Sequence, residues 1–182
     1  MAEPSRRALL LGVAAATAAA APAGETAWDF SFESIEEGKL PLAQFRGRVL
    51  LVANTASFCG YTYQYKALEA LYAQDAESGL TVVGVPSQDF NQESDSNGKV
   101  KSFCEATFGV QFPMAGLTHV RGPQAHPFYA WVRAQKDWEP SWNFNKVLVG
   151  RDGLIAGLYP ATEEPDGAKL RRALDIALAA TV

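Results

Sequence analysis

The sequence predicts an α/β domain of three layers, in which helices cover both faces of a mixed central sheet. Two short apolar runs, residues 49–53 and 80–85, are typical of strands that are buried on both faces. Helical patterns lie between and after these runs, so that strands and helices alternate along the chain. The length of 182 residues fits one domain with a short appendage, and 48% hydrophobic with 20% charged residues is typical of a globular protein.

The first half of the domain is predicted from its N-terminal end as follows. Residues 28–32 alternate apolar and polar side chains and precede a turn at Gly38, which indicates an N-terminal β-hairpin. Residues 49–53 form the first buried strand. Apolar side chains recur at helical spacing through residues 63–76, which predicts a helix. The second buried strand follows at residues 80–85.

The second half begins with a polar loop at residues 93–98. Its predicted elements are a helix at 99–108, a helix at 125–135, strands at 145–150 and 154–158, and a final helix at 165–179. The chain shows no internal repeat and no linker. The order of elements therefore favours the thioredoxin fold, with a mixed central sheet and an N-terminal β-hairpin.

The first 23 residues have the pattern of an export signal. The pair Arg6-Arg7 precedes an uncharged, alanine-rich run at 8–21, and Ala21-Pro22-Ala23 forms a small-x-small cleavage site. Adjacent arginines before such a run resemble a bacterial twin-arginine signal. We therefore expect a signal at 1–23, a domain at 24–182, and a periplasmic or otherwise exported protein. An ordinary secretory signal and a retained anchor are the alternatives.

Composition excludes several functional classes. The formal net charge of −4 argues against a nucleic-acid-binding surface and against a polybasic membrane anchor. No apolar run after the signal is long enough for a membrane span, so we expect no stable membrane insertion. Two cysteines are too few for a disulfide scaffold. In an exported protein, however, a structural disulfide competes with a reactive thiol as the explanation for them.

Cys59 lies between the first buried strand and the helix that follows it. Ligands of α/β sheets bind at this carboxyl end of the strands. The amides of a helix N-terminus also favour a thiolate there. A buried structural cysteine is the alternative, because cysteine is among the most frequently buried residues. Cys104 stands inside a predicted helix, and its position alone indicates a structural role.

A fast cysteine needs more than ionisation. About 3% of a thiol with an ordinary pKa is ionised at pH 7, so complete ionisation gains only about 30-fold. Further acceleration requires donors aimed at the sulfur or at the leaving oxygen. Gln92, Trp142 and Asn143 carry suitable N–H groups. Their alternatives are a core aromatic for Trp142 and solvated loop positions for Gln92 and Asn143.

Four segments resemble motifs of the glutathione peroxidase family. NTASFCGYT resembles its nucleophile motif, and PSWNFNKVLV resembles its Trp-Asn-Phe-x-Lys signature. GLTVVGVPSQDFNQE resembles the segment that carries its catalytic glutamine, and AHPFY resembles a further signature. The four occur in the family's order and cover roughly residues 30–160. Their combination is far more specific than any one of them.

This resemblance implies a function and a set of site residues. Cys59 falls on the peroxidatic position, and Gln92, Trp142 and Asn143 fall on its three partners. Cys104 matches the resolving cysteine of the two-cysteine, thioredoxin-dependent subgroup. The resemblance thus implies a peroxidase without a cofactor, which reduces hydrogen peroxide or organic hydroperoxides. A Cys59 sulfenic acid would be resolved as a Cys59–Cys104 disulfide, with a thioredoxin-like protein or glutathione as reductant.

The sequence departs from the family pattern at the glutamine segment. This segment is one residue short, and Ser87 and Asp89 replace the usual Cys and Gln. Aligning Gln92 by the glutamate after it leaves Gln88 as a possible substitute. The connection before Trp142 lacks the insertion of tetrameric, glutathione-using members, so a monomer is expected.

Two functions of other classes remain open. The first is a non-catalytic exported protein of the same fold with a structural Cys59–Cys104 disulfide. The second is a copper-delivery protein, which would need two closely spaced cysteines and a histidine. His119 and His126 have no metal-ligand pattern around them, so we expect no metal site.

Overall fold

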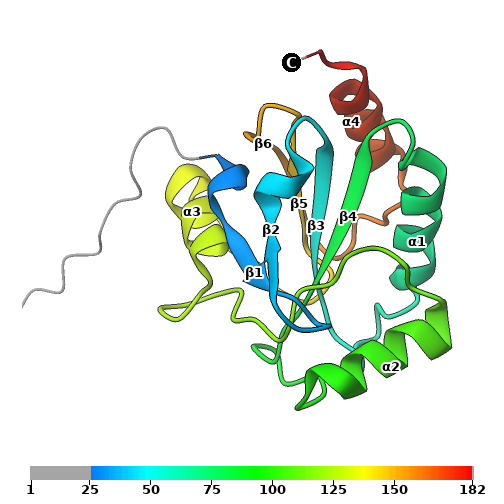
Figure 1. The fold of residues 1–182 in the computed structure, drawn as a ribbon, viewed down its shortest axis with the longest axis vertical. Helices are drawn as coiled ribbons and strands as arrows, with labels where there is room; N and C mark the ends of the chain where they lie inside the picture. The colour runs from blue at the N-terminus through cyan, green and yellow to red at the C-terminus, as the bar shows by residue number, and fades with distance from the viewer. Residues whose placement is uncertain (1–25, 182) are drawn as a thin grey trace, which may run out of the picture.

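A mixed sheet of four strands forms the centre of the computed structural model, which describes residues 26–181 (Figure 1). The strand order is β4-β3-β5-β6; β4 runs parallel to β3, whereas β5 is antiparallel to both β3 and β6. The predicted mixed sheet is thereby confirmed. The bounds of its strands are β3 Val49–Thr55, β4 Leu80–Pro86, β5 Lys146–Val149 and β6 Ile155–Tyr159.

Helices cover both faces of this sheet, as predicted. In Figure 1, α1 and α4 lie on one side and α3 on the other, while α2 lies below the carboxyl ends of β3 and β4. Each helix begins or ends within three residues of its predicted limits. The helices are α1 Gln64–Asp75, α2 Asn97–Phe108, α3 Pro127–Lys136 and α4 Ala168–Ala179.

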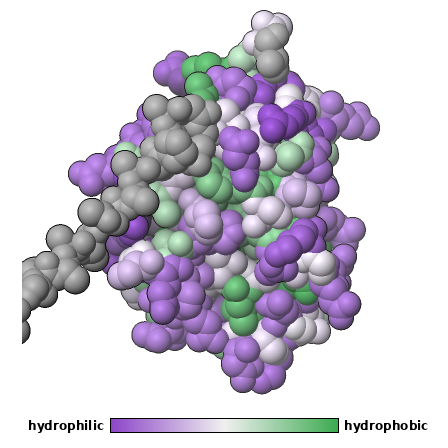
Figure 2. Space-filling model, turned by 60° about the vertical axis from the view of Figure 1, so that its left-hand side comes forward, coloured by the Kyte–Doolittle hydropathy of each residue, from purple (hydrophilic) through white to green (hydrophobic). Residues whose placement is uncertain are grey.

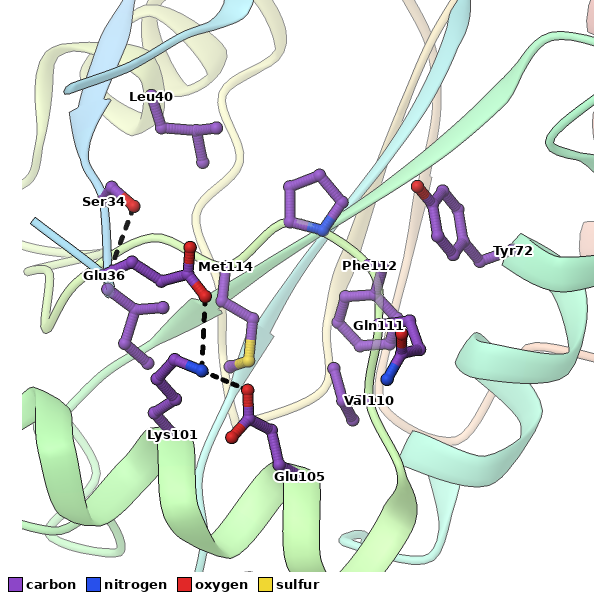
Figure 3. Close-up of a pocket in the computed structure, with 12 residues that line it drawn as sticks. Ser34, Glu36, Leu40, Tyr72, Lys101, Glu105, Val110, Gln111, Phe112 and Met114 are labelled. Atoms are coloured by element: carbon purple, nitrogen blue, oxygen red, sulfur yellow. Dashed lines mark hydrogen bonds and ion pairs between the residues drawn. The ribbon is translucent and has the colours of Figure 1, made fainter. Parts of the chain in front are cut away.

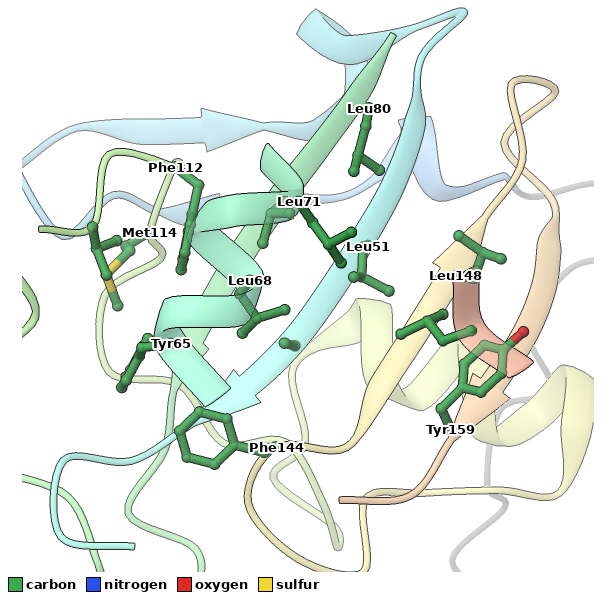
Figure 4. Packing of buried hydrophobic residues seen from close by; sticks show 14 of the residues in the cluster. Leu51, Tyr65, Leu68, Leu71, Leu80, Phe112, Met114, Phe144, Leu148 and Tyr159 are labelled. Carbon is green, nitrogen blue, oxygen red and sulfur yellow. The ribbon is translucent and has the colours of Figure 1, made fainter. Parts of the chain in front are cut away.

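Successive side chains of β3 point to opposite faces of the sheet, and this divides the core into two clusters. Leu51 and its neighbours two residues away face α1 and α4, whereas Leu50 and Val52 face α3 and the N-terminal hairpin. Figure 4 shows the first cluster, in which Leu51 and Leu68 lie between sheet and helix. Burying one leucine side chain contributes about 1.5–3 kcal/mol, so this continuous strand anchors both layers.

The N-terminal hairpin is shorter than the sequence predicts. Its strands are β1 (Ser31–Glu33) and β2 (Lys39–Pro41), which pair antiparallel. The predicted strand at 28–29 is wrong, because these residues belong to the 3₁₀-helix η1 (Ala27–Asp29). The carboxylate of Asp29 accepts hydrogen bonds from the backbone N–H of Thr26 at 2.8 Å and from its hydroxyl at 3.1 Å. These local bonds turn the chain and prevent it from extending.

A glycine allows this N-terminal turn to dock on the sheet. Gly153 lies in the β5–β6 turn with φ of +83°, a left-handed conformation that favours glycine. A Cβ at this position would collide with the side chains of Trp28 and Thr26. The backbone N–H of Ala27 donates to the Gly153 carbonyl at 2.9 Å. The described chain therefore begins on the β5–β6 turn.

The surface is largely polar where Figure 2 displays it. Hydrophilic residues predominate on this face, and hydrophobic ones are exposed only in small separate patches. Within residues 26–181, no helix has both the length and the apolar character that a membrane crossing requires. The predicted export signal at 1–23 lies outside the described residues.

Candidate active site

Cys59 lies in the loop that leaves the carboxyl end of β3. Its side chain is 4% exposed, and it lies five residues before the first residue of α1. The backbone N–H of Tyr61 points at its sulfur, with a nitrogen–sulfur distance of 3.5 Å. The predicted strand-to-helix placement of the cysteine is observed.

Gln92 and Asn143 are in direct contact, although 51 residues separate them. Asn143 Nδ2 donates to Gln92 Oε1 at 3.0 Å. The backbone carbonyl of Gln92 accepts the N–H of Phe58 at 2.9 Å, which ties the pair to the residue before Cys59. Because its oxygen is engaged, the Gln92 amide presents its NH₂ group as a donor. Asn143 is fully buried and is not the solvated loop residue of the alternative interpretation.

The second glutamine of this segment is differently placed. Gln88 is exposed, and its Nε2 donates to the backbone carbonyl of Ser94 at 2.8 Å. It thereby stabilises its own loop. Of the two glutamines, the structure brings only Gln92 to Asn143, which supports the alignment through Glu93.

Trp142 is not a core residue, because 40% of its side chain is exposed. Its ring lies against Phe90, with ring centroids 5.4 Å apart and planes inclined by 51°. Asn54 holds the segment on both sides of Asn143: its Nδ2 donates to the Trp142 carbonyl at 3.0 Å, and its backbone carbonyl accepts the Phe144 N–H at 2.5 Å. The backbone therefore fixes the position of Trp142, while Phe90 supports its ring.

Sequence reasoning missed Asn54, and a signal for it existed. Asn54 is an amide inside the otherwise apolar strand β3, where it is 1% exposed. A buried polar side chain in a central strand needs a partner. A search for a loop whose backbone could bond to this buried amide would have drawn attention to the Trp142 segment.

Buried oxygens gather around the carboxyl end of β3. Within residues 26–181, several of them have no hydrogen-bond partner in the protein. Glu93 is among these residues, and its burial raises the pKa of its carboxyl, which the hydrogen bond from the Ser94 N–H to its other oxygen opposes. Unpartnered buried polar atoms are rare in proteins and are often found at reactive sites. The unpartnered oxygens around the carboxyl end of β3 are Asn54 Oδ1, Thr55 Oγ1, Ser57 Oγ, Glu93 Oε2 and Asn143 Oδ1.

Cys104 lies in α2 and is completely buried. Burial raises the pKa of its thiol to about 11; the Tyr65 hydroxyl opposes this shift, and Glu93 and Glu105 add to it. Both Cys59 and Cys104 are free and buried in this structure. A disulfide requires Cα atoms within about 7 Å, and the two thiols stand on different elements, Cys59 in the loop after β3 and Cys104 in α2.

Helix α2 packs on the core through two fully buried residues and through the partly buried Phe103 and Phe108. Val100 and Cys104 are its only two fully buried residues. A cavity of about 380 Å³ lies between α2, the β1–β2 turn and residues 110–114. Figure 3 shows the residues that line it. Lys101 spans it and pairs with Glu36 at 3.2 Å and with Glu105. Exposed pairs of this kind contribute only about 0–1 kcal/mol, so they add little to the packing that holds α2 on the core.

Lys146, the lysine of the PSWNFNKVLV segment, is fully buried in β5. Its Nζ donates to Gln64 Oε1 at 2.6 Å and to the Glu163 carbonyl at 2.5 Å. Burial lowers the pKa of this amine to about 8, while the nearby Glu164 and Glu163 oppose the shift. The contacts join the start of α1 to the loop before α4, so Lys146 fixes the helix that follows the Cys59 loop.

The histidines have local partners. His126 caps α3, because its Nδ1 accepts the Phe128 N–H at 3.2 Å, and its ring stacks on Phe32. His119 Nδ1 lies 2.6 Å from Asp89 Oδ1. In the part of the chain that the structure describes, no group of three or more His, Cys, Asp and Glu side chains is arranged to hold a metal ion.

Comparison with known proteins identifies relatives of this arrangement. The family model "Glutathione peroxidase" matches residues 27–133. A hydroperoxy fatty acid reductase of Synechocystis sp. is 38% identical over 157 residues, which cover 80% of this chain and 93% of that protein. A glutathione peroxidase-like peroxiredoxin of Schizosaccharomyces pombe is 35% identical over 144 residues, or 76% of this chain and 91% of that protein.

Solved structures give the same relationship. The crystal structure of Trgpx in its apo form superposes with a TM-score of 0.68 at 33% identity, and the match covers 85% of this chain and 97% of that chain. A thiol:disulfide interchange protein of the thioredoxin family from Chlorobium tepidum superposes with a TM-score of 0.60 at 18% identity, over 82% and 93% of the two chains. The second likeness concerns the fold alone, and it confirms the predicted thioredoxin fold.

Proposed function

This chain belongs to the glutathione peroxidase family and is a thiol-dependent peroxidase, and we propose that Cys59 is its peroxidatic residue. The observation that carries this assignment is the bond between Gln92 and Asn143. Their pair is tied by the Gln92 carbonyl to the backbone of Phe58, which directly precedes the thiol. We assign these two amides and the Trp142 indole to one site with Cys59.

The peroxide step uses the donors of this constellation. The Cys59 thiolate attacks one peroxide oxygen, the O–O bond breaks, and the sulfur is oxidised to a sulfenic acid. The departing oxygen takes a proton and leaves as water or as an alcohol. Donors from Gln92, Asn143 and Trp142 stabilise the charge on the sulfur and on that oxygen. The Tyr61 N–H, 3.5 Å from the sulfur, adds a backbone donor.

Cys104 resolves the oxidised cysteine. After α2 opens, the Cys104 thiolate attacks the Cys59 sulfur, a disulfide forms, and the hydroxyl leaves as water. The small number of buried residues on α2 supports this opening. A thiol on the same chain meets the sulfenic acid at an effective concentration that dilute external thiols do not reach.

A thioredoxin-like dithiol protein is the reductant that this disulfide suits. Thiolate exchange followed by attack of the second cysteine completes the reduction. Relatives named glutathione peroxidase-like peroxiredoxins occur in Schizosaccharomyces pombe and in Saccharomyces cerevisiae. The short connection between His126 and Trp142 supports a monomer with an open site, so that a protein reductant can approach.

Family membership favours this function over the two alternatives. A non-catalytic protein with a permanent disulfide leaves the Gln92–Asn143 pair without a purpose. A copper-delivery protein requires closely spaced cysteines, whereas Cys59 and Cys104 lie on different elements. Stopped-flow mixing of the reduced protein with hydrogen peroxide or a fatty-acid hydroperoxide tests the proposal. Consumption no faster than by free cysteine would overturn it.

We expect Gln92→Ala to slow the peroxide step by about 10²–10³-fold, because loss of one oriented donor has effects of this size. Gln88→Ala is the matched control. It removes the same amide from an exposed position and should leave the rate unchanged. Stopped-flow rates of peroxide consumption by the two reduced variants show which glutamine takes part in the peroxide step. If Gln88→Ala is slow and Gln92→Ala is not, the alignment is wrong.

The protein is proposed to act outside the cytoplasm after twin-arginine export. The Arg6-Arg7 pair and the Ala21-Pro22-Ala23 site support this. Replacing both arginines by lysine keeps the charge and should retain the protein in the cytoplasm, as measured by cell fractionation. Undiminished export of this double variant would contradict the twin-arginine route, and processing near Gly24 in the wild type is the accompanying expectation.

A further inference from the structure

The orientation of the Trp142 indole needs an explanation that burial does not provide. Trp142 is 40% exposed, so burial in the core does not hold its ring in one orientation. Phe90, which is itself only 8% exposed, provides a wall at a ring-centroid distance of 5.4 Å. A donor that must point at a reacting sulfur works only in a narrow range of orientations. Whatever fixes Phe90 therefore also limits Trp142.

Phe90 is in turn held from a distant loop. The guanidinium carbon of Arg121 lies 5.3 Å from the centroid of the Phe90 ring, in a cation–π contact. Arg121 and Phe90 are 31 positions apart, and they belong to loops that follow different elements. A separate set of contacts must therefore keep the two loops together.

Asp89 supplies these contacts. Its Oδ2 accepts the backbone N–H of Val120 at 2.6 Å and that of Arg121 at 3.2 Å, while its Oδ1 lies 2.6 Å from His119 Nδ1. Both carboxylate oxygens are thus used, and the side chain is only 10% exposed. Because Asp89 directly precedes Phe90, it fixes the phenyl ring relative to Arg121.

Glu139 holds the other end of the same loop. Its Oε2 accepts the Gly122 N–H at 3.1 Å and the Arg133 guanidinium at 3.3 Å, and its Oε1 lies 3.5 Å from Arg121. Glu139 stands three residues before Trp142. Residues 119–122 are therefore bound on one side to the segment that carries Phe90 and on the other to the segment that carries Trp142.

We propose that Asp89 is a positioning residue for Trp142, acting through residues 119–122 and the Arg121–Phe90 contact. The inference rests on the proposed function, in which Trp142 donates to the reacting sulfur. Asp89 occupies a place where the chain departs from the family's glutamine, so the device belongs to this chain's own sequence. An asparagine keeps one oxygen for the N–H groups of Val120 and Arg121 but lacks the negative charge that strengthens both hydrogen bonds.

The test is Asp89→Asn, which keeps the size of the side chain. We expect it to slow the reaction of the reduced protein with hydrogen peroxide by about 10-fold. It should have no further effect in a Trp142→Phe background. Subtracting the fluorescence of the Trp142→Phe protein isolates the Trp142 signal, and we expect iodide to quench that signal more strongly in Asp89→Asn. Asp95→Asn is the matched control, because Asp95 is exposed and pairs with Lys99 at 2.8 Å.

A second variant keeps the test decisive if Asp89→Asn folds poorly. Arg121→Gln removes the cation over Phe90 but leaves the backbone N–H that Asp89 binds, and it should change rate and quenching in the same direction. Equal slowing with and without Trp142, or unchanged quenching, would overturn the positioning role. If Trp142→Phe alone leaves the peroxide rate unchanged, the proposed role of Trp142 fails. The quenching of Trp142 then still decides whether Asp89 positions it.

Discussion

Cys59→Ser is expected to abolish peroxide reduction, lowering the rate by more than about 10³-fold, as is usual when a catalytic nucleophile is removed. A serine hydroxyl is not ionised at neutral pH and is a poor nucleophile toward a peroxide oxygen, whereas the Cys59 sulfur accepts the Tyr61 N–H and follows Phe58, to which the Gln92–Asn143 pair is tied. Stopped-flow consumption of hydrogen peroxide by the reduced proteins measures the effect.

The expected loss depends on Cys59, and not Cys104, being the thiol that reacts with peroxide. Cys104→Ser provides the control, because it retains Cys59 and should consume the first equivalent of peroxide at the wild-type rate. Consumption by Cys59→Ser at even a tenth of the wild-type rate would contradict the assignment. Cys104 would then have to be tested as the nucleophile.

Cys104→Ser should stop turnover with thioredoxin after about one equivalent of peroxide. Burial raises the pKa of the Cys104 thiol to about 11, so in the closed helix only about one in 10⁴ of these thiols is ionised at pH 7. Resolution therefore requires α2 to open and expose the thiol, and serine cannot attack even then. The Cys59 sulfenic acid should accumulate and react with dimedone, which mass spectrometry detects.

Ser102→Ala is the matched control for this variant. Ser102 is exposed on the same helix two residues before Cys104, and its loss should leave turnover with thioredoxin unchanged. The two-cysteine mechanism is wrong if Cys104→Ser cycles with thioredoxin like the wild type. It is equally wrong if peroxide-treated wild type contains no Cys59–Cys104 disulfide. Turnover of the variant with glutathione would be compatible with it.

The regular part of the fold could be predicted because local sequence determines it. The apolar run at β3 has side chains for both faces, and each of the two core clusters receives alternate residues from it. The start of the N-terminal hairpin could not be predicted in this way. Its alternating pattern favours a strand, but the bonds between Asp29 and Thr26 close a turn instead. Short segments are decided by single capping contacts.

The nucleophile candidate, the two-cysteine hypothesis and the family resemblance could be read from the amino-acid sequence, because they depend on residue types in a fixed order. Which glutamine contacts Asn143 became clear only from the folded chain, since Gln88 and Gln92 are four residues apart in one loop and bind different partners. The roles of Asn54 and Asp89 likewise emerged only in three dimensions. Each binds a segment at least 30 residues away, and the packing of the fold, not the local sequence, creates such contacts.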